Sequence, residues 1–281
     1  MRLGGRESGN VEDRRGRRVS GRGVAVGGGL GTIVLVVIAL LLGVDPGELL
    51  QGQPGGPQPQ MTQQREVPRD DPGRRFIAQV LGETEDVWRA EFARRGARYE
   101  DPRVVLFSGA TESGCGFAQA QMGPFYCPRD RRVYIDLDFM ADLQRRLGAN
   151  GDFAAAYIVA HEVGHHVQNQ MGVLGRAEQA RRGMGEAAGN AMQVRIELQA
   201  DCLAGVWARR AHETRNILER GDIEEGLNAA AAVGDDRLQS AGRGYVQPES
   251  FTHGTSAQRA GWFRRGLESG RIEACDTFSG G

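Results

Sequence analysis

The sequence lacks lysine entirely. All 35 of its basic residues are arginines, and 36 acidic residues leave a formal net charge of -1. A general nucleic-acid binder usually has a strong basic surplus, so this balance argues against nucleic acid as a partner. The arginines are scattered along the whole chain, and we attribute their use in place of lysine to genomic coding bias.

Histidine and cysteine are also scarce, with five and four residues in a chain of 281. Three of the five histidines, His161, His165 and His166, nevertheless fall within the short segment AHEVGHHVQNQ.

The chain length allows one good-sized domain with appendages or two small domains, and the ordinary apolar content allows a real core to form.

Long apolar runs are absent except for one near the amino terminus. Residues 24–44, VAVGGGLGTIVLVVIALLLGV, carry no charge and as a helix would be about 30 Å long, enough to cross a bilayer. Arginines precede this run and acidic residues follow it, so the positive-inside rule predicts a single transmembrane helix with a cytoplasmic amino terminus. A cleaved signal peptide and a buried core helix are the alternatives, but no convincing small-residue cleavage site follows the run. The preceding arginines are Arg2, Arg6, Arg14, Arg15, Arg17, Arg18 and Arg22.

The chain is therefore predicted to divide into four parts. These are a cytoplasmic basic tail (1–23), the transmembrane helix (24–44), a flexible linker (45–72) and one extracytoplasmic domain (73–281). The linker is predicted from the stretch QGQPGGPQPQMTQQ, which is rich in proline, glycine and glutamine and carries no charge.

Within the domain, strands come first. Residues 103–109 resemble a strand that ends at a glycine. Residues 131–139 alternate apolar and polar side chains, which predicts a strand with one buried face. Before both, residues 74–96 have apolar side chains at helical spacing, and we expect Gly82 to divide them into two helices, with Thr84 capping the second.

Helices dominate the rest of the chain. Two long helices are predicted for GDFAAAYIVAHEVGHHVQNQMG and NAMQVRIELQADCLAGVWARRAHE, joined by a connection that contains several glycines. A small sheet followed by helices predicts a helix-rich α+β domain. The connection covers residues 172–190, and the shorter helices are expected at 139–148, 222–233 and 256–267.

The histidine-rich segment has the spacing of a metal site. His161 and His165 are four residues apart, so on a helix they lie one turn apart on the same face, and both imidazoles can reach one ion. Glu162 projects about 100° further round the helix, where it can contact a water bound to that ion. This is the HExxH arrangement, in which zinc lowers the pKa of the water and the glutamate takes its proton. His166 faces away from the metal side and is expected to be a structural residue or one that supports a ligand from outside the coordination sphere.

A third ligand is expected on the next long helix. A catalytic zinc site has three protein ligands and one open position. Glu197, in IELQADCLAG, is the candidate, and Asp201 lies one turn further along on the same face. From there its carboxylate could accept the free ring N–H of a ligand histidine. The ExxxD spacing is similar to that of thermolysin-like zincins with a glutamate ligand.

Several long segments resemble the neutral zinc metallopeptidase family of bacteria, which are single-span proteins with a zincin-like outer domain. The resemblance covers the glycine-rich anchor and most of the chain from about residue 70. It implies a metallopeptidase fold and says little about substrates. The matching segments are GCGFAQAQMGPFYCPRDRRVYIDL, VAHEVGHHVQNQMG, RIELQADCLAGVWA and ESFTHGTSAQRAGWFRRGLESG.

Peptide hydrolysis also needs a donor to the oxyanion that develops on the carbonyl oxygen. His253, in a glycine-containing turn before a helix, is the first candidate, and Tyr245 is the second. A capping or surface role for His253 is the alternative. In zincins, the substrate extends along a sheet edge, and the strand predicted over 131–139 could supply that edge.

The even number of cysteines suggests two disulfides in an extracytoplasmic domain. Three pairings are possible. The preferred one joins Cys115 to Cys127, closing the loop between the predicted strands, and Cys202 to Cys275, tying the carboxyl-terminal segment to the second long helix. Free buried thiols are the alternative, and a cysteine zinc site is disfavoured because no CxxC pair exists.

The predicted function is a membrane-anchored zinc endopeptidase that acts on peptide or protein substrates outside the cytoplasm, with Zn²⁺ as cofactor. Two rivals belong to other classes. One is a non-catalytic binding module that kept the fold, which is disfavoured because a scaffold does not need Glu162. The other is a zinc amidase acting on a non-peptide amide bond, such as one in cell-wall material.

Overall fold

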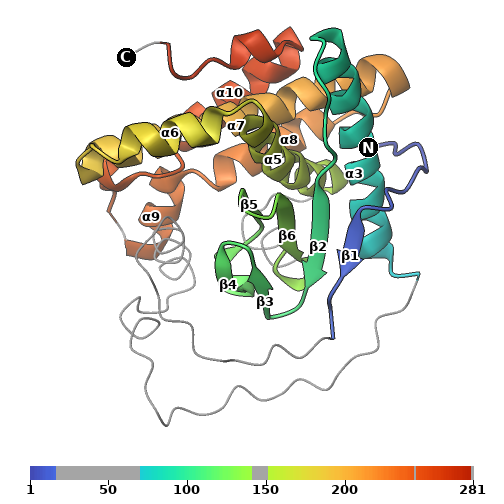
Figure 1. Ribbon diagram of the computed structural model, residues 1–281, viewed down its shortest axis with the longest axis horizontal. Coiled ribbons are helices and arrows are strands. Elements are labelled where there is room, and N and C mark those ends of the chain that lie inside the picture. Colours follow the sequence, from blue (N-terminus) through green and yellow to red (C-terminus); the bar gives the residue numbers. More distant parts are fainter. Residues whose placement is uncertain (17–69, 141–150, 244, 280–281) are drawn as a thin grey trace.

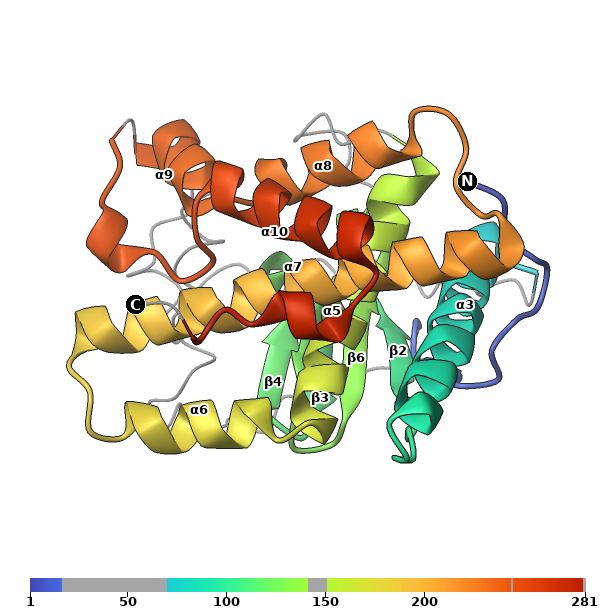
Figure 2. The ribbon, with the colours of Figure 1, turned by 90° about the horizontal axis from the view of Figure 1, so that it is seen from above.

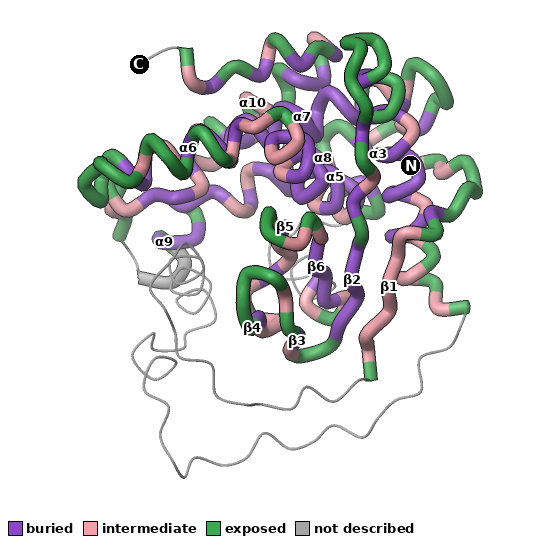
Figure 3. The backbone as a smooth tube through the Cα atoms, viewed as in Figure 1, coloured by how far each residue is buried: buried purple, intermediate pink, exposed green. Residues whose placement is uncertain are grey.

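The computed structural model describes residues 1–16, 70–140, 151–243 and 245–279 (Figure 1). A small sheet lies beneath a layer of long helices, which confirms the predicted helix-rich α+β class. Figure 3 shows that burial is concentrated along the central helices and the strands β2 and β6, where the two layers meet.

The main sheet has four strands in the order β1, β2, β6, β5. The first three are parallel to one another, and β5 is antiparallel to β6. Two further strands form a separate antiparallel hairpin. The strands are β1 (Val11–Asp13), β2 (Arg103–Phe107), β3 (Ala110–Ser113), β4 (Gly116–Gln119), β5 (Phe125–Cys127) and β6 (Arg132–Asp136).

Both faces of β6 are buried, so the prediction of one buried face for residues 131–139 is wrong. Val133 and Ile135 join the core beneath the helices, whereas Tyr134 packs with Phe107 in a second, smaller cluster on the opposite face. The strand also lies inside the sheet, between β2 and β5, so it is not the edge that the sequence suggested. Alternation of apolar and polar letters misses this because Tyr134 is buried despite its hydroxyl.

The helices mostly follow the predicted segments. The two long helices, α5 and α7, and the shorter α8 and α10 are where periodicity placed them, whereas α6 and α9 were not predicted. The helix expected at 139–148 falls largely outside the described residues. The helices are α3 (Pro72–Arg94), α5 (Asp152–Gln170), α6 (Val173–Arg181), α7 (Glu186–Arg215), α8 (Asp222–Ala232), α9 (Asp235–Arg243) and α10 (Ser256–Ser269), with short 3₁₀ turns η1 (Ala120–Met122), η2 (Pro248–Ser250) and η3 (Ile272–Cys275).

Helix α3 is continuous, so the predicted division at Gly82 is wrong. A Cβ atom at this position would lie 2.9 Å from the backbone oxygen of Arg6, so the glycine allows a distant segment to approach the helix closely. The Thr84 hydroxyl donates to the carbonyl of Leu81 at 2.7 Å within the helix and caps nothing.

Residues 1–16 pack against the domain, although the sequence assigned residues 1–23 to a separate tail. Ser8 N donates to Ala78 O at 2.9 Å, and the guanidinium of Arg6 lies 3.1 Å from Glu85 and 2.8 Å from Asp86. The strand β1 then extends the sheet beside β2. Two of its three residues are acidic, which is why no strand was predicted here.

The predicted transmembrane helix, residues 24–44, lies outside the described residues. Among the residues that the structure does describe, no helix is both long enough and apolar enough to span a bilayer.

Glycines allow α7 and α10 to pack closely side by side (Figure 2). A Cβ atom at Gly205 of α7 would clash with the carbonyl oxygen of Phe263, and one at Gly266 of α10 would clash with that of Cys202. The contact therefore brings the two backbones together with no side chain between them.

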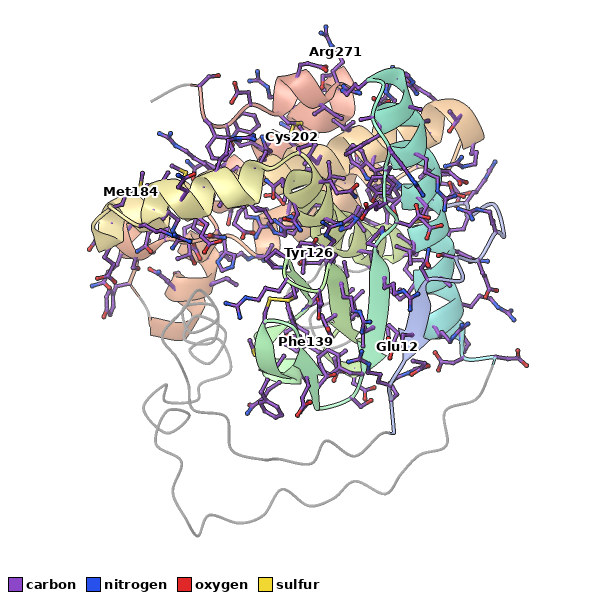
Figure 4. All side chains as sticks on the ribbon, in the orientation of Figure 1. Glu12, Tyr126, Phe139, Met184, Cys202 and Arg271 are labelled. Atoms are coloured by element: carbon purple, nitrogen blue, oxygen red, sulfur yellow. A yellow bond between two sulfur atoms is a disulfide. The ribbon has the colours of Figure 1, made fainter. Side chains whose placement is uncertain are left out.

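The preferred cysteine pairing is confirmed. Cys115 is bonded to Cys127 with the sulfur atoms 2.08 Å apart, and Cys202 to Cys275 at 2.05 Å. The first bond joins the turn of the β3–β4 hairpin to β5, near Tyr126 in Figure 4, and the second joins α7 to η3.

Candidate metal centre

The site is built where α5 crosses α7, and a glycine inside the histidine motif lets the two helices meet. A Cβ atom at Gly164 would lie 3.0 Å from the carbonyl oxygen of Ala200, which is tighter than most packing contacts. The glycine therefore lets the HExxH face of α5 approach the ExxxD face of α7.

Three predicted site residues come together at this crossing. Nε2 of His161 lies 3.2 Å from Oε2 of Glu197, and Nε2 of His165 lies 3.6 Å from the same oxygen. One ligand atom from each of these residues lies within 4.8 Å of the others. All three side chains are largely removed from solvent. Two imidazole nitrogens and a carboxylate oxygen thus converge on a volume the size of one ion.

The other ring nitrogen of His161 is held by Asp201. Its Nδ1 lies 2.7 Å from Oδ1 of Asp201, which also accepts a hydrogen bond from the Tyr157 hydroxyl at 2.5 Å. The guanidinium of Arg259 holds both carboxylate oxygens, with Nε 2.9 Å from Oδ2 and Nη2 2.9 Å from Oδ1. A buried carboxylate with four donors keeps a fixed orientation, so the imidazole Nε2 is directed away from it, toward Glu197.

Electrostatic interactions in the site favour charged carboxylates. Burial raises the pKa of Glu197, but the imidazoles of His165 and His161 outweigh it and hold that pKa well below its usual range. Burial lowers the pKa of His161, but Asp201 and Glu197 outweigh it and raise that pKa to about 10. The pKa of His165 is also raised, since Glu197 outweighs burial. The imidazoles and the carboxylates therefore stabilise each other's charged forms.

Glu162 lies beside this cluster and makes no hydrogen bond to it within the described structure. Glu162 is only 8% exposed. Burial raises its pKa, and the nearby charges of His161 and His165 act in the opposite direction. A carboxylate in such a setting is a better proton acceptor than one in water.

The structure also brings His253 near the cluster. It lies close enough to Glu197 for an electrostatic interaction between the two side chains. A Cβ atom at the adjoining Gly254 would lie 3.3 Å from Leu198, so this loop packs directly on α7. Nδ1 of His253 lies 3.0 Å from Oδ1 of Asp235, whose other oxygen accepts hydrogen bonds from the backbone N–H groups of residues 252–254.

The remaining histidine and tyrosine candidates lie elsewhere. Nδ1 of His166 lies 3.0 Å from the Tyr126 hydroxyl on β5, and its Nε2 lies 2.7 Å from the carbonyl of Glu100, so this histidine joins α5 to the sheet. Tyr245 is 56% exposed and, in the described part of the chain, forms no hydrogen bond with the cluster. Its proposed role stays a prediction.

Several residues around the site were missed. Arg259 lies on α10, an amphipathic helix, and Asp235 lies on α9, a helix that was not predicted. Charged residues on such helices are usually solvent-exposed. Gln168, which contacts His165, and its neighbour Gln199 are ordinary helix residues in the sequence. No spacing rule distinguishes a buried glutamine from an exposed one, so no signal in the sequence identified these partners.

A second group of carboxylates, from Asp152, Asp222 and Glu225, lies where α5 and α8 begin. The α-amine of Met1 lies 2.7 Å from Asp152 and 3.4 Å from Asp222. These carboxylates therefore already face the amino group of the chain itself.

The fold and the site together define a class: an α+β protein with an HExxH helix whose two histidines meet a glutamate from the following long helix. The family described as "Putative neutral zinc metallopeptidase" matches residues 1–278, and the chain belongs to this family. The family description names zinc as the metal and suggests peptide hydrolysis as the activity.

Relatives cover nearly the whole chain. The uncharacterized protein YpfJ of Escherichia coli strain K12 is 47% identical over 282 residues, which cover 98% of this chain and 97% of that protein. The uncharacterized protein Rv2575 of Mycobacterium tuberculosis strain H37Rv is 44% identical over 254 residues, covering 86% and 85%. No solved structure matches the chain.

Proposed function

We propose that the protein is a zinc-dependent peptidase in which His161, His165 and Glu197 bind the ion and Glu162 is the general base. The observation that carries the proposal is the convergence of both imidazole Nε2 atoms on one oxygen of Glu197. Each Nδ1 has another partner, Asp201 for His161 and Gln168 for His165, so both Nε2 atoms are left for a metal.

The donor set fits zinc. Two imidazole nitrogens and one carboxylate oxygen are the ligands of a catalytic zinc that keeps its fourth position open. A bound zinc ion would lower the pKa of a coordinated water toward neutrality. The residues present therefore match the metal that the family description names.

Glu162 would move the proton. Its carboxylate accepts a proton from the attacking water as the water oxygen bonds to the substrate carbonyl carbon. The C–N bond then breaks, and the same proton passes to the leaving amine. The raised pKa that burial gives Glu162 suits both steps, because the carboxyl group must bind and then release the proton.

His253 is the donor that we propose for the oxyanion. Asp235 holds Nδ1 of the ring at 3.0 Å, and among the described residues Nε2 has no hydrogen-bond partner. Asp235 also fixes the loop through three backbone N–H groups, so the imidazole would be preorganised for the developing charge.

For the substrate we propose strand addition to β5. This strand is one of the two edges of the main sheet, and its Tyr126 side chain bonds to His166 and Asn169 of the HExxH helix. An extended peptide along β5 would therefore run beside α5.

We also propose that residues 24–44 associate with a membrane and that the domain lies in an oxidising compartment. Two disulfides support that location. Because residues 1–16 pack on the domain, the chain before and after the apolar segment would lie on the same side of the membrane. The cytoplasmic amino terminus predicted from the arginines is at odds with this packing.

Replacement of Glu162 by glutamine tests the assignment. The amide keeps the size of the side chain but cannot accept the proton, so we expect about 10²- to 10⁴-fold lower peptidase activity with unchanged zinc content. Glu178→Gln, on the exposed surface of α6, is the control and should keep both. Full peptidase activity in the Glu162→Gln protein would refute the proposed role.

A further inference from the structure

Gln168 lies one turn beyond His165 on α5 and takes no part in the proton transfers above. It is 0% exposed, and its amide is fully hydrogen-bonded. Oε1 lies 2.8 Å from Nδ1 of His165. Nε2 donates to the carbonyl oxygen of Ile196 at 2.8 Å and to Oε1 of Gln199 at 3.0 Å.

These partners fix the direction of the amide. A carboxamide donates only through its nitrogen and accepts only through its oxygen. Since two acceptors face Nε2, Oε1 must face His165, and Nδ1 of His165 must carry the hydrogen. In the neutral ring that a metal ligand requires, the lone pair is then on Nε2, the atom that faces Glu197 at 3.6 Å.

The hydrogen bonds continue away from the site. Oε1 of Gln199 is used by Gln168, so Nε2 of Gln199 points outward and donates to the carbonyl oxygen of Cys275 at 2.9 Å. Cys275 is bonded to Cys202, which lies on α7 one turn beyond Gln199. The chain of hydrogen bonds from His165 thus ends on a carbonyl that the disulfide holds against α7.

We propose that Gln168 is the positioning residue of the second metal-binding histidine, and that the Cys202–Cys275 disulfide anchors the far end of its hydrogen-bond chain. The inference rests on the proposed zinc site. It gives His165 a counterpart to Asp201 at His161, with one difference: the partner is neutral. Removing Gln168 therefore changes the geometry at His165 without changing the charge near the ion.

The expected effect is on zinc affinity. Without an acceptor for Nδ1–H, the ring of His165 is free to rotate or to adopt the other tautomer, and both place Nε2 less well for the ion. Loss of such a partner usually lowers metal affinity about 10- to 100-fold.

The main test compares two glutamines on the same helix. Methionine keeps the length of the side chain and removes its amide. In the Gln168→Met protein we expect zinc affinity, measured by competition with a chromogenic chelator, to fall about 10- to 100-fold. Gln170→Met is the control: this amide bonds to the backbone of Glu100 and to Nε2 of His166. It touches neither His165 nor the ion site, so affinity should stay unchanged.

Two results are decisive. If wild-type protein binds zinc and Gln168→Met binds it equally well, the positioning role is refuted and the zinc site stands. If wild-type protein binds no zinc, the proposed function itself fails. Circular dichroism shows whether the Gln168→Met protein folds. If it does not, Gln199→Met is tested instead, because this change breaks the same hydrogen-bond chain one link further from His165 and should also weaken zinc binding.

Two double variants test the role of the Cys202–Cys275 disulfide. Cys202→Ser with Cys275→Ser should weaken zinc binding in the folded protein, because the carbonyl that ends the chain is no longer held. Cys115→Ser with Cys127→Ser removes the disulfide beside β5 and should leave zinc affinity unchanged. Equal zinc affinity in the two double variants would refute the anchoring role.

Discussion

Arg259 of α10 holds Asp201 of α7 through two hydrogen bonds, each 2.9 Å long, and Asp201 in turn holds His161. A third helix is therefore connected to an imidazole of the proposed zinc site through one carboxylate. The planar guanidinium can bind both oxygens at once, which an ammonium group cannot do.

Replacing Arg259 by lysine should therefore weaken the site although the positive charge is kept. We expect about tenfold lower zinc affinity, at the low end of the usual effect of such partners, because Asp201 loses one of its fixed donors. Arg215→Lys, which alters an arginine paired with Glu83 elsewhere on α7, is the control. Unchanged zinc affinity in the Arg259→Lys protein would show that charge alone, and not the paired geometry, matters.

Zinc binding should release protons. Without metal, Asp201 and Glu197 raise the pKa of His161 to about 10 against the opposing effect of burial, so the ring is protonated at neutral pH. A ligand histidine must be neutral, so the ion displaces this proton and zinc affinity rises with pH up to about 10. Calorimetry at pH 7 in buffers of different ionisation enthalpy measures the release.

The control for proton release is His212→Gln, at a histidine near the end of α7 that bonds to the backbone of Leu218. Zinc binding to this variant should release as many protons as zinc binding to the wild type. Zinc binding that is independent of both buffer and pH would contradict the proposed arrangement of charges.

The contact between α7 and α10 should depend on Gly266. Alanine there would clash with the carbonyl oxygen of Cys202, so we expect urea unfolding to show a loss of about 1–3 kcal/mol or more. Alanine at Gly261 of the same helix meets nothing within 4 Å and should stabilise by about 0.5–1 kcal/mol through helix propensity. Equal effects at the two positions would show that the close approach is not needed.

Residues 1–16 and the domain should be accessible from the same side of a membrane. Gly9→Cys and Gly183→Cys place thiols at two positions with open space around them, and the four native cysteines are all in disulfides. A membrane-impermeant thiol reagent should label both or neither in intact cells. The topology predicted from the arginines requires labelling at Gly183→Cys alone, and that result would show that β1 does not pack on the domain in the cell.

The sequence predicted the features that a few neighbouring residues determine and missed those that depend on residues far away in the chain. Helix α5 and its paired histidines were predictable because helical spacing is encoded within a few residues, and Glu197 was found by asking for a third ligand on the next long helix. The undivided α3 was missed because the reason for Gly82 is Arg6, far away in the sequence. The interior position of β6 likewise depends on β5, whose three residues are too few for a periodic signal.

The partners of the site were less predictable than its candidate ligands. Arg259 and Asp235 act through hydrogen bonds between elements that are separate in sequence. Gln168 contacts His165 within α5, but its amide is fixed by the backbone of Ile196 on α7. Their residue types are common on exposed helix faces, so only the packed structure shows that they are buried or partnered.

The most direct test of the zinc site is anomalous X-ray scattering at the zinc absorption edge from crystals of the zinc-loaded protein. The proposed zinc site predicts one strong peak about 2.0–2.2 Å from Nε2 of His161, Nε2 of His165 and a carboxylate oxygen of Glu197. A peak only at the carboxylates of Asp152 and Asp222, or none at all, would contradict it.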